Sequence, residues 1–291
     1  KSVLPKPVGP TMTSSRLVLI VVIIVALEIA EFAHHFAENR PFVVLRARFR
    51  RIVLVGNANG ALSNITSYVG LEAALCQLSS QEQDNLTMSS RVIETEESLV
   101  AGDENYIGYE SMGKNNINGI STPLELTRLA ARPDVVGIKT NFTRPELLER
   151  TVTIESITVD NQKTASRFFS HDYWGAVVAA GNLGTSPSTP MDLVVDNNTS
   201  LSEIAYRTYV MENDGSEQPT ELLIKATISA KDPYQARTRE FRAVINEKGL
   251  SAYGHNFVKR NYVYKISLVF DDESFKEDIL YGTVRIVITV A

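Results

Sequence analysis

The sequence predicts a mainly β protein, and two patterns carry that prediction. Near the C-terminus, residues 260–270 and 281–291 alternate between two faces with a period of two, which is typical of half-buried strands. Further upstream, short strand-like segments follow one another between turn signals such as Asn161-Gln162 and Asn213-Asp214-Gly215. Many short strands with little helix indicate a β-sandwich.

Composition and charge narrow the class of protein. The 291 residues are 44% hydrophobic, which is normal for a globular chain and excludes wholesale disorder. A formal net charge of −5 provides no basic footprint for nucleic acid. The single cysteine, Cys76, allows no internal disulfide and no cysteine-rich metal site. Its helical spacing within Leu71–Leu78 predicts a buried, unreactive side chain.

The apolar run Leu17–Leu27 follows an extended arm, residues 1–16, that contains three prolines. At eleven residues the run is too short to cross a membrane as a helix, which needs ~20 residues. Valine and isoleucine dominate it without a polar break. This composition predicts a strand that is buried on both faces.

Two segments of the N-terminal part are predicted to be helical. Glu28–Glu38 has an apolar face at helical spacing and is ended by Asn39-Arg40-Pro41. Leu62–Leu78 is predicted to be helical from about Ser67 onwards. Between the two, Phe42–Val55 is strand-like and ends in a turn at Gly56–Gly60.

Residues 122–142 fit either a helix or a strand, and beyond them strands recur. The expected strands are 152–159, 174–179, 193–195, 205–211, 222–229 and 241–244, followed by the final pair. The chain therefore divides near residue 120. Residues 1–120 form an N-terminal part with strands and short helices, and residues 121–291 form a C-terminal, mostly β part.

The final pair of strands has defined faces. In the first strand Tyr262, Tyr264, Ile266, Leu268 and Phe270 share one face. In the second, a shared face is formed by Val284, Ile286, Ile288 and Val290. A terminal strand this apolar must be buried, either in its own sandwich or in that of a neighbouring molecule.

No catalytic, cofactor or metal signature is found. The sequence has no phosphate-binding loop, no dinucleotide fingerprint and no nucleophile elbow. His34 and His35 are adjacent rather than four apart, so a solvated helix face is favoured over a zinc site. The cluster His171–Trp174 fits an aromatic group at a strand edge better than a ligand-binding loop. The sequence therefore predicts a protein that is not an enzyme, with no catalytic residues and no cofactor.

Four stretches resemble the fimbrillin family of Bacteroidales, the major and minor fimbrial subunits also called type V pilins. They occur in the family's order along residues 50–291, although each is weak alone, and Pro133 departs from the pattern and predicts interrupted strand pairing. The stretches are Ile52–Leu62 with Gly56-Asn57-Ala58, Leu126–Asp134 with Arg128 and Arg132, Tyr206–Ile224 with Glu212-Asn213 and Pro219-Thr220, and Val258–Tyr264 with Arg260-Asn261.

The resemblance implies two transthyretin-like Greek-key β-sandwich domains, of which the N-terminal one carries added short helices. It also implies a lipoprotein precursor exported to the outer membrane, whose only membrane contact is its lipid anchor. An arginine-specific protease would then remove an N-terminal strand, with Arg16, Arg40 and Arg46 as candidate cleavage positions. A strand from another fimbrial subunit would fill the resulting groove in a cell-surface fimbrium that adheres to host or bacterial receptors.

Two questions stay open at the level of sequence. The exchanged strand is either the N-terminal one or the C-terminal one, and the position of the subunit (stalk, tip or anchor) is undetermined. The candidate exchange residues are Leu17, Leu19, Val21, Ile23, Val284, Ile286, Ile288 and Val290. The alternative function is a cell-surface β-sandwich lipoprotein that binds carbohydrate or protein ligands through Asp172, Tyr173 and Trp174.

Overall fold

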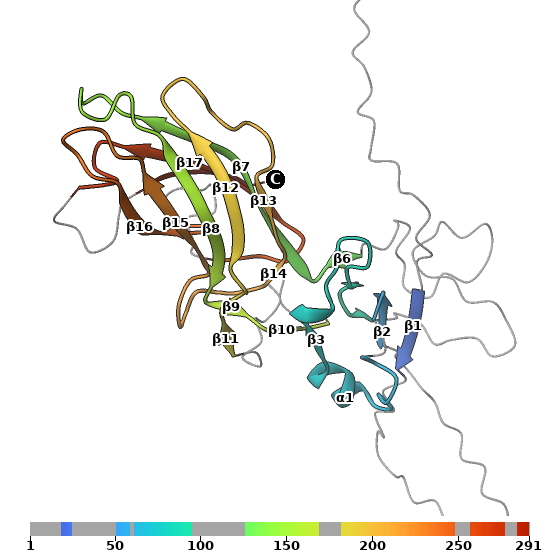
Figure 1. Cartoon of the computed structure of the whole chain (residues 1–291). Coiled ribbons are helices and arrows are strands. Elements are labelled where there is room, and N and C mark those ends of the chain that lie inside the picture. The colour runs from blue at the N-terminus through green and yellow to red at the C-terminus, as the bar shows by residue number, and fades with distance from the viewer. Residues whose placement is uncertain are drawn as a thin grey trace, which may run out of the picture.

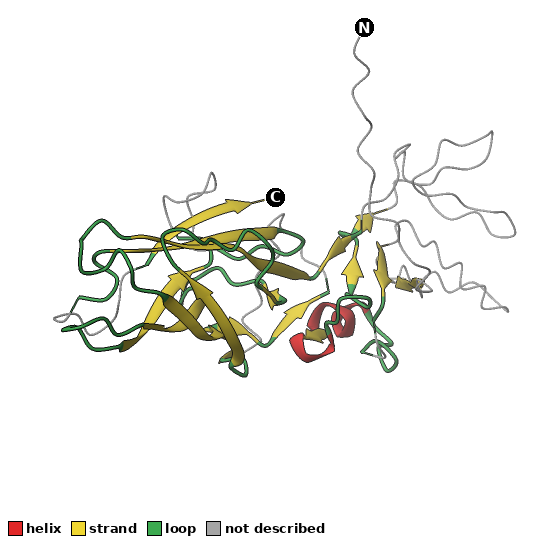
Figure 2. Cartoon of the chain, turned by 45° about the horizontal axis from the view of Figure 1, so that its top comes forward, coloured by secondary structure: helices red, strands yellow, loops and turns green. Residues whose placement is uncertain are grey.

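A computed structural model of the chain describes residues 19–24, 51–58, 61–94, 126–168, 182–247, 257–276 and 284–290 (Figure 1). Within these residues eighteen strands accompany one short α-helix and one 3-10 helix. The prediction of a mainly β protein is therefore confirmed. Figure 2 shows that the helices lie beside the N-terminal sheet.

The N-terminal part forms a five-stranded sheet in the order β1-β2-β4-β6, with β5 also paired to β2. Its elements are β1 (Leu19–Ile24), β2 (Arg51–Gly56), α1 (Tyr68–Ala73), β3 (Leu75–Gln77), the 3-10 helix (Leu78–Ser80), β4 (Met88–Ser89), β5 (Ile93–Glu94) and β6 (Thr127–Arg128). Strands β1 and β2 have six residues each, whereas β4, β5 and β6 have two. The sheet is thus built around the β1–β2 pair.

The C-terminal part forms two larger sheets. One has the order β12-β8-β15-β16, and the other has the order β13-β7-β17-β18 with β14 also paired to β7. The elements are β7 (Ala130–Asn141), β8 (Val152–Asp160), β9 (Gln162–Lys163), β10 (Ala165–Arg167), β11 (Leu183–Gly184), β12 (Thr189–Val195), β13 (Tyr206–Arg207), β14 (Val210–Met211), β15 (Glu221–Ile228), β16 (Arg237–Val244), β17 (Val263–Asp271) and β18 (Arg285–Val290). Strands β7 and β17 run parallel, while the other pairs in these two sheets are antiparallel.

One apolar core lies between these two sheets. Phe241 of β16 and Phe270 of β17 meet edge to face across it, with ring centroids 5.0 Å apart. Phe275, just after β17, packs against both rings. The predicted alternation accounts for this packing, because Tyr264, Ile266, Leu268 and Phe270 are all buried and Lys265 between them is exposed. Two facing sheets around one core form the predicted β-sandwich in this part of the chain (Figure 2).

The ambiguous segment 122–142 is a strand where the structure describes it. The twelve residues of β7 occupy the middle of a sheet between β17 and the β13–β14 edge. The apolar residues at the start of this segment have a helix-like spacing, but pairing with strands on both sides of β7 makes it a strand. Long-range pairing decides such a segment, since local propensity is nearly balanced there.

The predicted helix over 62–78 is much shorter than expected. It begins at the N-cap Ser67, whose hydroxyl accepts a hydrogen bond from the Gly70 N–H at 3.0 Å. It ends at Ala73, because Leu75–Gln77 pairs as β3 with the distant strand β10. Cys76 in β3 is only 2% exposed, so the prediction of a buried thiol is confirmed, and this burial raises its pKa.

Pro133 interrupts pairing on one side of β7 only. The neighbouring antiparallel edge is split into β13 and β14, which pair with residues on either side of Pro133. Between the two strands the Thr208 N–H donates to the Pro133 carbonyl at 3.2 Å. On the other side the parallel register with β17 continues through Pro133. The expected interruption is therefore confirmed where proline would have had to donate a hydrogen bond.

Several predicted elements lie outside the described residues. These are the arm 1–16, the helix Glu28–Glu38, most of the strand Phe42–Val55, the strand 174–179 and the domain boundary near residue 120. The boundary stays a prediction.

Candidate strand-exchange site

The N-terminal exchange candidate is an edge strand. All six residues of β1 pair antiparallel with β2, and the register places Leu19, Val21 and Ile23 opposite Gly56, Leu54 and Ile52. No other strand pairs with β1 among the described residues. In Figure 1 β1 is also the described element farthest from the sandwich. Leu19–Ile24, the described part of the predicted strand Leu17–Leu27, is thus paired within its own chain, with β2 as its partner.

Strand β2 offers a complete binding edge to β1. Ile52, Val53 and Val55 are at most 4% exposed, and Val53 and Val55 belong to a core cluster with Leu71, Cys76 and Leu129, so residues outside β1 also anchor β2. Its opposite edge pairs with β4 and β5, and between them the Leu54 N–H donates to the Ser90 hydroxyl at 3.0 Å. Loss of β1 would therefore leave a six-residue row of backbone groups without partners.

The C-terminal candidate, β18, completes its own sandwich. It pairs antiparallel with β17 from Tyr264↔Val290 to Val269↔Arg285. Ile288 is 8% exposed and belongs to the core, and Val284 is partly buried against it. Val287, on the opposite face, is 51% exposed. The predicted inner face is therefore confirmed for Ile288 and Val284, while the side chains of Ile286 and Val290 lie outside the described residues.

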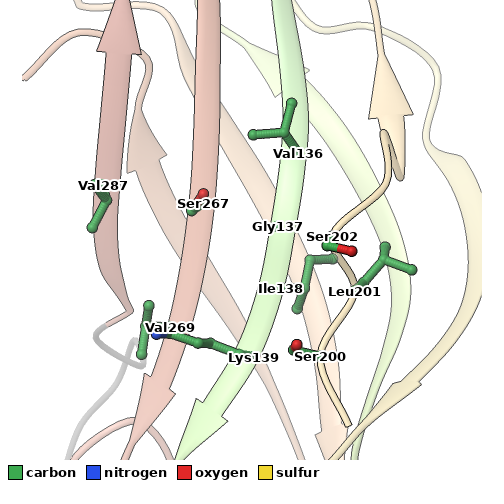
Figure 3. A pocket seen from close by; sticks show the side chains of 10 residues that line it. All are labelled: Val136, Gly137, Ile138, Lys139, Ser200, Leu201, Ser202, Ser267, Val269 and Val287. Carbon is green, nitrogen blue, oxygen red and sulfur yellow. The ribbon is translucent and has the colours of Figure 1, made fainter.

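A shallow hollow lies on the outer face of this sheet, beside β18 (Figure 3). Its volume is about 390 Å³, and its floor is one row of paired residues, Gly137, Ser267 and Val287. The register between β7 and β17 shifts at Val136, which produces a bulge. A Cβ atom on Gly137 would lie 3.0 Å from the Ser267 hydroxyl oxygen, so a larger residue at this position would crowd the floor of the hollow.

A buried ion pair joins β14 to the segment before β17. An Arg260 Nη2 lies 2.7 Å from Glu212 Oε2, and the two side chains are 13% and 2% exposed. Arg260 also donates to the carbonyls of Phe168 and Arg167 and to the Ser166 hydroxyl. Because β10, which contains Ser166 and Arg167, pairs with β3, this arginine helps to hold the N-terminal part against the sandwich.

Burial controls the electrostatics of this junction. Desolvation raises the pKa of Glu212, against the opposing effect of the Arg260 guanidinium and Lys259. Glu212 and Arg260 occur in separate motifs of the sequence, and their pairing was not predicted. Glu212 is followed by Asn213-Asp214, and Arg260 lies between Lys259 and Asn261, so no local pattern marked either charge as buried.

The other motif residues also form structural joints. The Asn213 amide donates to the carbonyls of Asn161 and Gln218 and to the Thr220 hydroxyl. The buried Asp134 carboxylate is held by both Arg132 and Arg207. Asn57 and Asn261 have positive φ angles of 57° and 64°, which asparagine adopts more readily than most residues. The motifs therefore mark corners and joints of the fold.

Several candidate residues lie outside the described part of the chain. They are the cleavage candidates Arg16, Arg40 and Arg46, the exchange candidate Leu17 and the alternative ligand contacts Asp172, Tyr173 and Trp174. Among the described residues no group of three or more histidine, cysteine, aspartate or glutamate residues could hold a metal ion. No helix within those residues is long and apolar enough to span a membrane.

Comparison with known proteins defines the class. A family model described as "Fimbrium tip subunit Fim1C-like, C-terminal domain" matches residues 129–283, just over half of the chain, and one described as "Major fimbrial subunit protein (FimA)" matches residues 41–128. The class is that of fimbrial subunits, which are structural proteins of a cell-surface appendage and not enzymes. Within it, this chain belongs to the Fim1C-like family.

Individual relatives agree with this assignment. A Parabacteroides distasonis protein named as a fimbrium tip subunit, Fim1C, is 42% identical over 252 residues, which are 86% of this chain and 66% of that protein. A crystal structure of a cell adhesion protein from the same species matches 84% of this chain and 76% of its own, with 37% identity and a TM-score of 0.75. A fimbrilin (FimA) structure from Porphyromonas gingivalis covers 84% of this chain and 80% of its own, at 18% identity and a TM-score of 0.56, and so shares the fold.

Proposed function

We propose that this chain is a fimbrial tip subunit that joins the next subunit through an exchanged β-strand. The observation that carries the proposal is β1, an entirely apolar strand that has β2 as its one neighbour within the described part of the chain, where β2 is well anchored. The tip position rests on the likeness to the Fim1C-like family and to its Parabacteroides relative. A tip subunit needs to accept a strand but need not donate one, which fits a β18 that stays in its own sandwich.

The energetics are adequate for a durable joint. An incoming strand that buries four apolar side chains beside β2 gains at most about 6–12 kcal/mol, at ~1.5–3 kcal/mol for each side chain. Backbone hydrogen bonds along the six-residue edge of β2 add to this gain. No cofactor or covalent bond is required.

The position of β1 along the chain distinguishes between the three candidate cleavage sites. Arg16 precedes β1, so a cut there leaves β1 attached to β2 through the chain. Arg40 and Arg46 lie between β1 and β2, so a cut at either one frees β1 to leave. We therefore favour Arg40 or Arg46 as the processing site of a lipoprotein precursor that reaches the outer membrane. In the full proposal the subunit has two transthyretin-like Greek-key domains. It assembles with other fimbrial subunits and binds a surface receptor in adhesion.

Proteolysis tests the proposal. The intact chain is cut with an arginine-specific protease, and a labelled peptide of residues 17–27 with solubilising lysines is then added. We expect the β1 fragment to dissociate slowly and the labelled peptide to form an SDS-resistant complex with the remainder. The control chain carries lysine at Arg40, Arg46, Arg48 and Arg50 and should neither release β1 nor take up peptide.

The outcomes distinguish the subunit positions. A trimmed chain that binds the peptide without polymerising is a tip subunit, whereas a ladder of SDS-resistant oligomers indicates a stalk subunit. A trimmed chain that neither binds the peptide nor polymerises would contradict strand exchange itself.

A further inference from the structure

The sandwich has four sheet edges, and three of them are protected against pairing with another strand. Strand β12 contains Pro190 and a register shift after it. The opposite edge of the other sheet is split into the two-residue strands β13 and β14. On β16, Arg237 and Arg239 reach the carbonyls of Phe275 and Lys276, which places charged side chains along that edge.

Strand β18 is less protected, and its one charged residue, Arg285, stands at its first position. Its six residues contain no proline, and its register with β17 is continuous. Among the described residues no strand pairs with its other side, and Figure 3 shows it as the outermost strand of the sheet. Its inner face is apolar at Ile288, which belongs to the core, and on its outer face the half-exposed Val287 borders the hollow and stands between Arg285 and Thr289 in the sequence of the strand. An uninterrupted edge of this kind is a template for strand addition.

We propose that two copies of this chain associate through their β18 edges, antiparallel, about a two-fold axis that passes through Val287. In an antiparallel pair, residues directly opposite each other point to the same face of the sheet. The two sandwich cores therefore lie on the same side of the joined sheet only if the two-fold axis passes through a residue position. An axis between two residue positions would place the cores on opposite sides. An axis at Val287 places the two exposed valines against each other and joins the two hollows across the axis.

The charges of β18 permit this register. With the axis at Val287, Arg285 of one copy is opposite Thr289 of the other, and Ile286 is opposite Ile288. No charged residue meets a like charge within the paired strands. An isologous contact of this kind closes at two copies, so it yields a dimer and not a fibre. The net charge of −5 on each copy opposes association, so the dimer should strengthen with added salt.

Cysteine cross-linking provides a direct test, because the native chain has one cysteine and it is 2% exposed. In the intact, uncut chain, V287C should form a disulfide-linked dimer under mild oxidation. The matched control is V194C, since Val194 is 55% exposed on the protected edge strand β12. T289C alone should behave like V194C, whereas the double variant R285C/T289C should cross-link.

Sedimentation velocity supplies an independent readout. The wild-type dimer fraction should rise with protein concentration, V287K should stay monomeric, and V194K should behave like wild type. An equimolar mixture of V287K and V287E should recover the dimer, because opposite charges then meet at the axis. The proposal is overturned if wild type remains monomeric at the highest concentration, if V287K still dimerises, or if V287C cross-links no faster than V194C.

Discussion

Strands β1 and β18 are both six-residue edge strands, but they lie in very different surroundings. The neighbour of β1 is the six-residue strand β2, beyond which the described residues continue the sheet as the two-residue strands β4, β5 and β6. The neighbour of β18 is the nine-residue strand β17, backed by the twelve-residue β7 and facing a second four-stranded sheet. A strand at the edge of a small sheet can leave at lower cost than one that completes a large core. The comparison therefore supports the proposal that β1 is the exchanged strand and that β18 keeps its place.

The largest expected effect comes from breaking the junction between the two parts. Replacing Arg260 by alanine leaves the Glu212 carboxylate buried without its partner, which costs about 3–5 kcal/mol of unfolding free energy. Chemical denaturation measures the loss. R207A provides the control, because Arg132 still pairs with Asp134. An R260A chain as stable as R207A would show that the junction does not depend on this ion pair.

The same junction should respond to pH. Because burial raises the pKa of Glu212, the folded chain binds a proton more readily than the unfolded chain does. The corresponding stability is complete below the unfolded pKa and is lost as the pH rises through the folded pKa. Relative to E212Q, which does not titrate, wild type should therefore gain stability as the pH is lowered from 7 towards 4. A difference in unfolding free energy that is independent of pH would contradict the raised pKa.

The two faces of β18 should differ in energy. Ile288→Ala should lower the unfolding free energy by about 2–4 kcal/mol, because it removes a core side chain. Val287→Ala, on the half-exposed face, should change it by less than ~0.5 kcal/mol. Denaturation midpoints at a protein concentration too low for association measure both. Equal effects would mean that β18 is not anchored by its inner face.

The smallest expected effect on stability concerns the turn at Asn261, just before β17. Asn261 has a positive φ of 64°, which costs most L-residues about 1–2 kcal/mol. N261G should therefore be more stable than N261A by about 1 kcal/mol. Both variants lose the contact between the Asn261 side chain and Arg128, so their difference isolates the backbone conformation. A more stable alanine variant would exclude strain at this corner.

Local pattern was sufficient to predict most of the sandwich. The alternation in residues 260–270 correctly gave the buried face of β17, and similar patterns gave β8 and β15. These strands are half-buried, so their pattern records which face meets the core. Pro133 was also read correctly, because its missing donor acts locally.

Features fixed by distant partners were not predictable. Leu75–Gln77 looks helical by its spacing, but its pairing with β10, which lies about ninety positions further along the chain, makes it a strand. The Glu212–Arg260 pair and the hollow at Gly137 likewise depend on strands brought together only by the fold. For the candidate strand-exchange site, the sequence pattern predicted both terminal strands. It did not predict that each is paired within its own chain.

Amide hydrogen exchange, followed by mass spectrometry on the intact chain, tests most directly whether β1 is the strand that can leave. If β1 is that strand, residues 19–24 and their partner edge in β2 should exchange much faster than residues 264–269 and 285–290. Deletion of residues 285–291 should also destabilise the sandwich, whereas deletion of residues 1–46 should leave its protection unchanged. Equal protection of β1 and β18, or faster exchange in β18, would contradict the account.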